Sequence, residues 1–146
     1  VRLLPDTLIV DVKEHDRLAV WQTAGHAYVI DSGGKVIPGA DAGRYPKLPL
    51  VVGKGADQTA SEILPLLAQR PRLMARIEAL VRVDERRWDL RLKDGSLIQL
   101  PAVDQDSALI RLDALDQRER LLDLGFARVD LRTPEEVAVR PSEGAV

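Results

Sequence analysis

Two adjacent arginines, Arg86 and Arg87, precede Trp88, and of all residues in this sequence they are the clearest candidates for binding chemistry. A guanidinium group can bind a carboxylate through two parallel hydrogen bonds, and it can also stack on an aromatic ring. Because alternate residues of a strand face opposite sides, Arg86 should share the face of Trp88 and Arg87 should lie on the other. The pair is either a clamp for a partner's carboxylate or the solvated end of a strand, and both alternatives stay open.

The last predicted strand, residues 136–140, is the second candidate for chemistry. Val137 and Val139 alternate along it with Glu136, Ala138 and Arg140. A strand near the end of a chain often lies at the edge of a sheet, where its N–H and C=O groups have no neighbour. Such an edge can accept a strand from a partner protein, although charged side chains such as Glu136 and Arg140 can instead keep it solvated.

A glycine-rich loop, Gly53-Lys54-Gly55, precedes a predicted helix. The N-terminus of a helix carries a partial positive charge and favours phosphate groups. The loop lacks both the P-loop spacing that ends in Lys-Ser/Thr and the three-glycine dinucleotide pattern. A small phosphate- or nucleotide-binding domain is therefore the alternative function, and an ordinary loop before a helix is the simpler explanation.

The remaining polar residues form no recognisable catalytic or metal-binding pattern. The two histidines, His15 and His26, lack the spacing that places two ligands on one helix face, and there is no cysteine. The acidic pair Asp84-Glu85 lies near a turn, and Ser96 has no histidine nearby in the sequence. We expect no catalytic residue, no cofactor and no metal site.

The composition is that of one globular domain. The chain has 146 residues and a net charge of −2 with acids and bases interspersed, which argues against a nucleic-acid or anionic-membrane surface. No apolar stretch approaches the roughly 20 residues that span a bilayer, and no signal-peptide pattern is present. Because a strand-like run follows Val1 almost at once, we expect the chain to be part of a longer protein.

The clearest predicted element is a hairpin at residues 86–101. Trp88, Leu90 and Leu92 recur at period two and should share one buried face. Asp94-Gly95 is a typical tight-turn pair, because glycine accepts a positive φ and aspartate tolerates it. The hairpin is therefore expected to contribute this apolar face to the core.

Two helices are predicted beside the strands. Thr59 and Glu62 have the spacing of a capping box at the start of one helix. Pro65 would remove a hydrogen bond inside that helix, so the helix either starts later, near Ser61, or kinks at Pro65. The second helix covers about residues 106–124. Because strands and helices do not alternate regularly, the fold class should be α+β. Further strands are predicted at residues 8–12, 18–21, 26–30, 35–37, 50–52, 77–83, 127–132 and 136–140.

An ordered set of short motifs resembles the FtsQ/DivIB family of bacterial cell division proteins, in its proteobacterial form. The motifs run across nearly the whole chain, from about Leu4 to Pro141, and their order is more specific than any one of them. They are Leu4-Pro5-Asp6-Thr7-Leu8-Ile9-Val10 with Glu14, Ala19-Val20-Trp21, Ile30-Asp31 with Gly34, Leu48-Pro49-Leu50 with Gly53, Arg86-Arg87-Trp88-Asp89-Leu90 with Gly95 and Leu100-Pro101, and Val129-Asp130-Leu131-Arg132.

The resemblance implies a fold, a location and a partner. It implies a mixed, largely antiparallel and curved sheet with two main helices, and a parent protein anchored in the inner membrane by a single segment, with its periplasmic part at the division septum. Residues 1–14 would contain the final strand of a truncated POTRA domain, residues 15–141 would be the β domain, and residues 142–146 a tail. The family is implied to be a non-enzymatic scaffold of the division machinery that binds the FtsB–FtsL pair.

The resemblance also implies where that partner would bind. A partner strand would add to residues 136–140, and Arg132 with one of Arg86 and Arg87 would meet acidic side chains. Some relatives carry aromatic residues at the positions of Thr133 and Pro141, so a partner pocket is expected to be shallower in this chain. The partner-binding residues expected on this basis are Arg86, Arg87, Arg132, Thr133, Glu136, Val137, Ala138, Val139 and Arg140.

Overall fold

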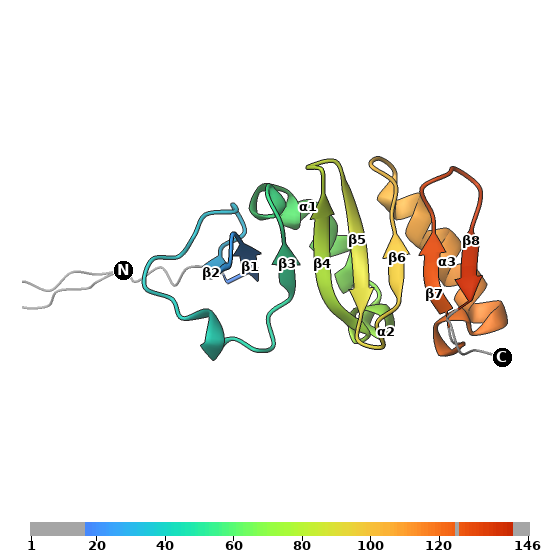
Figure 1. The fold of residues 1–146 in the computed structure, drawn as a ribbon, viewed down its shortest axis with the longest axis horizontal. Helices are drawn as coiled ribbons and strands as arrows, with labels where there is room; N and C mark the ends of the chain where they lie inside the picture. The colour runs from blue at the N-terminus through green and yellow to red at the C-terminus, as the bar shows by residue number, and fades with distance from the viewer. Residues whose placement is uncertain (1–16, 125, 142–146) are drawn as a thin grey trace, which may run out of the picture.

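The computed structural model describes residues 17–124 and 126–141. They form an open sheet of eight strands in the order β2-β1-β3-β4-β5-β6-β7-β8, with the helices packed against one face (Figure 1). The predicted α+β class is confirmed. The predicted strand at 8–12, with the POTRA assignment of residues 1–14, lies outside the described residues. The strands are β1 Ala19–Thr23, β2 His26–Ile30, β3 Leu50–Val52, β4 Ile77–Val83, β5 Arg87–Leu92, β6 Leu97–Gln99, β7 Phe126–Asp130 and β8 Ala138–Pro141.

The sheet is mixed. Hairpins pair β1 with β2, β4 with β5, β5 with β6 and β7 with β8 in antiparallel fashion. Crossover connections through helices make β3–β4 and β6–β7 parallel. Strand β3 is also parallel to β1, which it reaches after the chain has passed through β2 and a long loop. The main helices are α1 Ala56–Ala68 and α3 Gln105–Glu119. The chain also has the short helix α2 Pro71–Met74 and the 3-10 turns η1 Ala42–Arg44 and η2 Leu121–Asp123.

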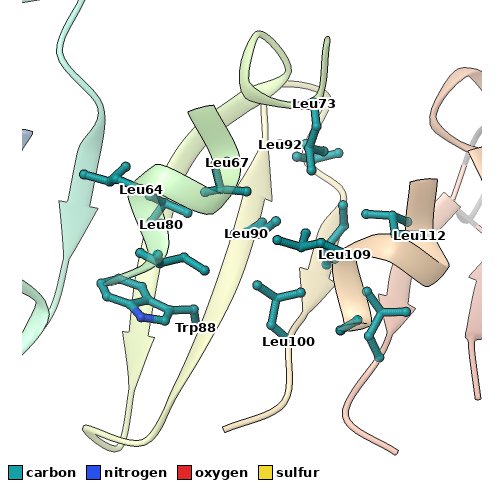
Figure 2. Packing of buried hydrophobic residues seen from close by; sticks show 14 of the residues in the cluster. Leu64, Leu67, Leu73, Leu80, Trp88, Leu90, Leu92, Leu100, Leu109 and Leu112 are labelled. Atoms are coloured by element: carbon teal, nitrogen blue, oxygen red, sulfur yellow. The ribbon is translucent and has the colours of Figure 1, made fainter. Parts of the chain in front are cut away.

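The core lies between the helices and one face of the sheet. Leu64 and Leu67 of α1 and Leu109 and Leu112 of α3 point toward the apolar side chains of the central strands (Figure 2). The predicted face of β5 is confirmed, because Trp88, Leu90 and Leu92 are all at most 2% exposed. We call this helix-covered side the inner face and the opposite side the outer face.

One apolar row crosses the whole sheet on its inner face. Its members are direct cross-strand partners, so they stack side by side across the strands. Central members such as Leu90 and Val129 are fully buried, whereas Val139 at the end of the row is 42% exposed. The apolar row consists of Tyr28, Trp21, Val51, Leu80, Leu90, Ile98, Val129 and Val139.

The predicted capping box at Thr59 is wrong. Helix α1 begins at Ala56, and its N-cap is Gly55, which has a φ of 81° that favours glycine. The hydroxyl of Thr59 donates to the carbonyl of Gly55, four residues earlier, at 3.1 Å. It therefore does not accept from a free N–H group at the start of the helix, as a capping side chain would. The helix continues through Pro65 to Ala68, with the predicted stripe of Ala60, Ile63, Leu64 and Leu67 buried.

Several predicted strand boundaries also differ. Residues 35–37 form only a single bridge, between Val36 and Ile30, and the neighbouring turn is held by the Asp31 carboxylate, which accepts from the N–H groups of Gly33 and Lys35. The hairpin partner of β2 is β1, across a turn at Ala24 and Gly25. The second main helix ends at Glu119, and a 3-10 turn completes the predicted range.

Candidate functional site

Strand β8 is the last strand of the sheet, and it lies at the open edge beside β7 (Figure 1). Its register pairs Ala138 with Asp130 and Val139 with Val129. All four residues of β8 are exposed. An exposed edge strand is the kind of element to which a second strand can be added.

One hydrogen bond between β7 and β6 shows which backbone groups of β8 are free. The N–H of Leu131 donates to the carbonyl of Gln99 on β6 at 2.9 Å. Backbone groups of successive residues in a strand point to opposite sides, so the groups of Asp130 point toward β8. Its partner Ala138 therefore uses its backbone groups on β7, and Val139 presents its N–H and C=O to the open edge. Pro141, the next residue with this orientation, has no N–H.

The turn before β8 is held by an arginine from helix α3. The guanidinium of Arg111 donates to the carbonyls of Leu131 at 3.3 Å, Thr133 at 3.2 Å and Glu136 at 3.4 Å. Glu135 in the same turn has a φ of 65°. This fixed turn is why β8 begins at Ala138, two residues later than the pattern of valines predicts.

Arg132, at the end of β7, forms a two-pronged pair with Asp130 on the outer face. Its Nε donates to Asp130 Oδ1 at 3.0 Å and its Nη2 to Oδ2 at 2.8 Å, and its backbone N–H also donates to Oδ1 at 2.9 Å. The hydrogen bonds from Arg132 lower the pKa of the Asp130 carboxyl below its ordinary value. The side chain of Arg132 is 44% exposed, so a second carboxylate can still approach it.

The two arginines that precede Trp88 separate in the structure. Arg86 lies exposed in the β4–β5 turn, where the positive φ values of Asp84 and Glu85 delay the strand until Arg87, so it does not share a strand face with Trp88. Arg87 lies on the outer face, as predicted, and its Nε is 3.3 Å from Asp89 Oδ1.

Arg87 and Arg132 share the outer face but stand two strands apart. The acid that each one pairs with lies in the same cross-strand row, because Asp89 faces Gln99 and Gln99 faces Asp130. Asp89 is only 7% exposed, and its burial raises the pKa of its carboxyl despite the neighbouring arginines. Arg87 therefore neutralises an acid of the domain itself, and Arg132 is the arginine nearer the edge strand.

A hollow of about 470 Å³ lies beside Arg132. The loop after β6, the first turns of α3 and the β7–β8 turn form its walls. Pro101, Val103 and Pro134 make much of the lining apolar. Its polar groups come from two arginines, two acids and a serine: Arg111, Arg132, Asp104, Glu135 and Ser107. The hollow adjoins the turn before β8, and no residue of β8 itself lines it.

Sequence reasoning overlooked three residues of this region: Arg111, Asp130 and Asp89. The spacing Asp130-x-Arg132 could have predicted a pair on one strand face, and Asp89 follows Arg87 by the same spacing. No sequence signal connects Arg111 to the β7–β8 turn, because that contact depends on how α3 packs on the sheet.

The loop Gly53-Lys54-Gly55 is occupied by the protein's own acid. Lys54 Nζ lies 3.3 Å from a carboxylate oxygen of Glu85. The Glu85 side chain also lies against Gly55, where an added Cβ would meet its Cγ at 3.3 Å. A phosphate at this helix end would have to displace Glu85, so the geometry does not favour the phosphate-binding alternative.

Other site types find little support in the described part of the chain. Across residues 17–124 and 126–141, no cluster of three or more acidic or histidine side chains could hold a metal ion. In the same residues, no helix is both long and apolar enough to pass through a bilayer.

Residues 19–132 match the family model "Cell division protein FtsQ/DivIB, C-terminal". Over all 146 residues the chain is 66% identical to "Cell division protein FtsQ" of Caulobacter vibrioides, of which it covers 48%. It is 41% identical over 145 residues to the protein of that name from Bradyrhizobium diazoefficiens, with 99% of this chain and 42% of the relative aligned. The chain thus spans about half the length of the curated relatives it matches.

A solved structure is also similar. It is described as the major extracytoplasmic domain of the trans isomer of the bacterial cell division protein DivIB from Geobacillus stearothermophilus. The alignment covers 75% of this chain and 98% of that one, with 15% identity and a TM-score of 0.49. The family model ends at Arg132, six residues before β8 begins, whereas the alignment with the Caulobacter relative includes the edge strand.

Proposed function

Because the chain belongs to the FtsQ/DivIB family of cell division proteins, we propose that it is a non-catalytic scaffold domain of the division machinery. Its partner in this proposal is the FtsB–FtsL pair, and the partner strand adds to β8. The open edge of β8 is the observation that carries the proposal.

The backbone of β8 supports strand addition. Val139 directs one N–H and one C=O to the edge, and its exposed side chain ends the apolar row. A strand paired with Val139 gains backbone hydrogen bonds that do not depend on side chains, and it covers the exposed end of the core. The absence of aromatic residues at Thr133 and Pro141 therefore leaves the main source of affinity intact.

Arg132 supports recognition of an acidic partner. It lies at the end of β7 that adjoins the β7–β8 turn, it lines the hollow, and nearly half of its side chain is exposed. A carboxylate of the partner can share the guanidinium with Asp130. Among the predicted site residues, Thr133 and Glu136 act through the turn that precedes β8, and Arg86 and Arg87 lie farther from the edge.

The proposal extends to the whole protein. The chain corresponds to about half of its relatives, so we assign the membrane anchor and the POTRA domain to the part before the described β domain. In this arrangement the domain stands on the periplasmic side of the inner membrane at the septum and holds FtsB and FtsL there, together with any other division proteins that join them.

Titration calorimetry of this domain with the periplasmic segment of FtsB from the same organism tests the proposal. Val139→Pro removes the N–H at the open edge and leaves the pairing of Ala138 with β7 in place, so it should abolish binding without unfolding the domain. Ala138→Pro is the contrast, because it breaks the β7–β8 ladder itself. Unchanged affinity of a folded Val139→Pro variant would contradict strand addition. A thermal shift with phosphate or nucleotides that disappears in Lys54→Ala would instead favour the ligand-binding alternative.

A further inference from the structure

Two arginines face each other on the outer face of the last two strands. Arg128 of β7 is the direct cross-strand partner of Arg140 of β8, and both are exposed. The same cross-strand row continues through Leu97 on β6 to Arg91 on β5. Like charges placed directly opposite each other destabilise a strand pair, so this arrangement has a cost in the isolated domain.

The acids of this face are paired with other arginines, although Arg128 still attracts the carboxylates of Asp89 and Asp130. Asp130 is bound by Arg132, Asp89 is paired with Arg87, and Glu78 lies 3.4 Å from Arg91. Neither Arg128 nor Arg140 forms an ion pair with any described residue. The end of the sheet therefore presents two adjacent positive charges beside the open edge.

The inner face of the same strand ends differently. Val139, next to Arg140, closes the apolar row and remains 42% exposed, although its neighbour Val129 is fully buried. A strand added to β8 would continue both rows, because cross-strand partners lie about 4.5–5.5 Å apart between Cβ atoms. It would set one residue opposite Arg140 on the outer face and the adjacent residue opposite Val139 on the inner face.

We infer that the strand that binds β8 carries an acidic residue opposite Arg140, directly next to an apolar residue opposite Val139. The carboxylate binds Arg140 from the open side of β8 and offsets the positive charge that Arg140 shares with Arg128, and the apolar side chain extends the core. This pairing rule is the same for a parallel and an antiparallel partner strand, with the two residues in reversed order. The inference rests on the proposed strand addition, and it makes Arg128 and Arg140 determinants of register as well as of affinity.

A charge-exchange experiment tests the inference with the FtsB periplasmic segment as the probe. Arg140→Glu should weaken binding roughly 5- to 20-fold, because it loses an ion pair and adds repulsion next to the partner acid. Each acidic residue of the segment is then replaced in turn by lysine. One of these lysine peptides should bind Arg140→Glu with restored affinity and bind the unchanged domain more weakly. In that peptide, the residue next to the introduced lysine should be apolar. Arg128→Glu should show the same preference with a smaller effect.

Arg118→Glu, an equal change of charge at an exposed position of α3, is the matched control. If Arg140→Glu binds as Arg118→Glu does, or if no lysine peptide restores it, the inference is overturned while strand addition still stands. If Val139→Pro also binds normally, strand addition itself has failed.

Arg140→Gln, which removes the charge without reversing it, should weaken binding by a smaller factor. It replaces Arg140→Glu in the experiment if thermal unfolding shows that the charge reversal disrupts the domain.

Discussion

The guanidinium of Arg132 holds the carboxylate of Asp130, two residues earlier on β7, through hydrogen bonds of 3.0 and 2.8 Å. The arginine expected to meet a partner acid is therefore already paired within the domain. A carboxylate from outside must share Arg132 with Asp130, whose own negative charge opposes its approach. The strength of partner binding at this point depends on how firmly Asp130 retains Arg132.

Asp130→Asn should tighten binding of the FtsB segment. Asparagine can keep the hydrogen bond from the backbone N–H of Arg132 through its carbonyl oxygen, but it removes the charge that competes with the partner acid. A gain of roughly two- to fivefold is expected, in the range of exposed ion pairs. Calorimetry of the two proteins measures it, and Arg132→Glu should weaken binding in the same assay. Weaker binding by a stably folded Asp130→Asn would indicate that Asp130 orients Arg132 for the partner instead of competing with it.

Arg111 should position the edge strand without touching a partner at β8. Arg111→Ala removes three hydrogen bonds to the carbonyls around the β7–β8 turn, so β8 should open more often. Hydrogen exchange should accelerate at the amides of Ala138 and Arg140, which pair with β7, while the amide of Leu90 in the central strand stays protected. Binding of the FtsB segment should weaken as well, because β8 is paired with β7 for less of the time.

Arg111→Lys and Arg118→Ala are the controls for that effect. Lysine keeps the charge at position 111 but cannot reach three carbonyls at once, so it should restore only part of the protection. Arg118 lies exposed on the same helix, and its loss should leave β8 unaffected. Uniform acceleration across the whole sheet in Arg111→Ala would argue for general destabilisation and against a role in positioning.

The hairpin of β5 and β6 was predictable from sequence because its determinants are local. The period of Trp88, Leu90 and Leu92 and the turn at Asp94-Gly95 lie within one short segment, and the structure buries that face as expected. The edge position of the last strand was expected from its place near the end of the chain. The ordered family motifs covered the same domain that the family model matches.

The start of α1 and the shape of the site were not predictable in this way. The residues at Thr59 and Glu62 resemble a cap, but the N-cap of the helix is Gly55, and the side chain that lies against Gly55 is Glu85, thirty residues away in the sequence. The parallel pairing of β6 with β7 determines which backbone groups of Val139 are free, and it exists only once α3 has crossed over. The opposition of Arg128 and Arg140 likewise depends on strand register, which single residues do not encode.

Arg70 should be the most important charged residue for stability. Its Nε is 2.6 Å from Asp113 Oδ2 on α3, its Nη1 donates to the Leu66 carbonyl at 2.8 Å, and its side chain is only 12% exposed. Arg70→Ala should lower the free energy of unfolding by about 1–3 kcal/mol, because a largely buried guanidinium with charged partners is lost. Urea denaturation measures the change. Arg44→Ala, which removes an exposed pair with Asp41, should change it by less than about 1 kcal/mol.

Asp89 and Asp130 should respond to pH with opposite signs, although they face the same residue, Gln99. The hydrogen bonds from Arg132 lower the pKa of Asp130 in the folded state. Asp130 therefore contributes stability that is present above its unfolded pKa, about 3.9, and is lost as the pH falls through the folded value. Burial raises the pKa of Asp89, so its contribution is complete below the unfolded pKa and is lost as the pH rises through the folded value.

Urea denaturation of the unchanged domain, Asp130→Asn and Asp89→Asn between pH 3 and pH 7 separates the two contributions. Relative to Asp130→Asn, the unchanged domain should lose stability as the pH is lowered, since protonation breaks the pair with Arg132. Relative to Asp89→Asn, it should lose stability as the pH is raised, since an ionised carboxylate is held in a buried position beside a single close arginine. Curves with the same sign for both variants would mean that Arg87 compensates fully for the burial of Asp89, and the outer face would then act as one continuous ion-pair network.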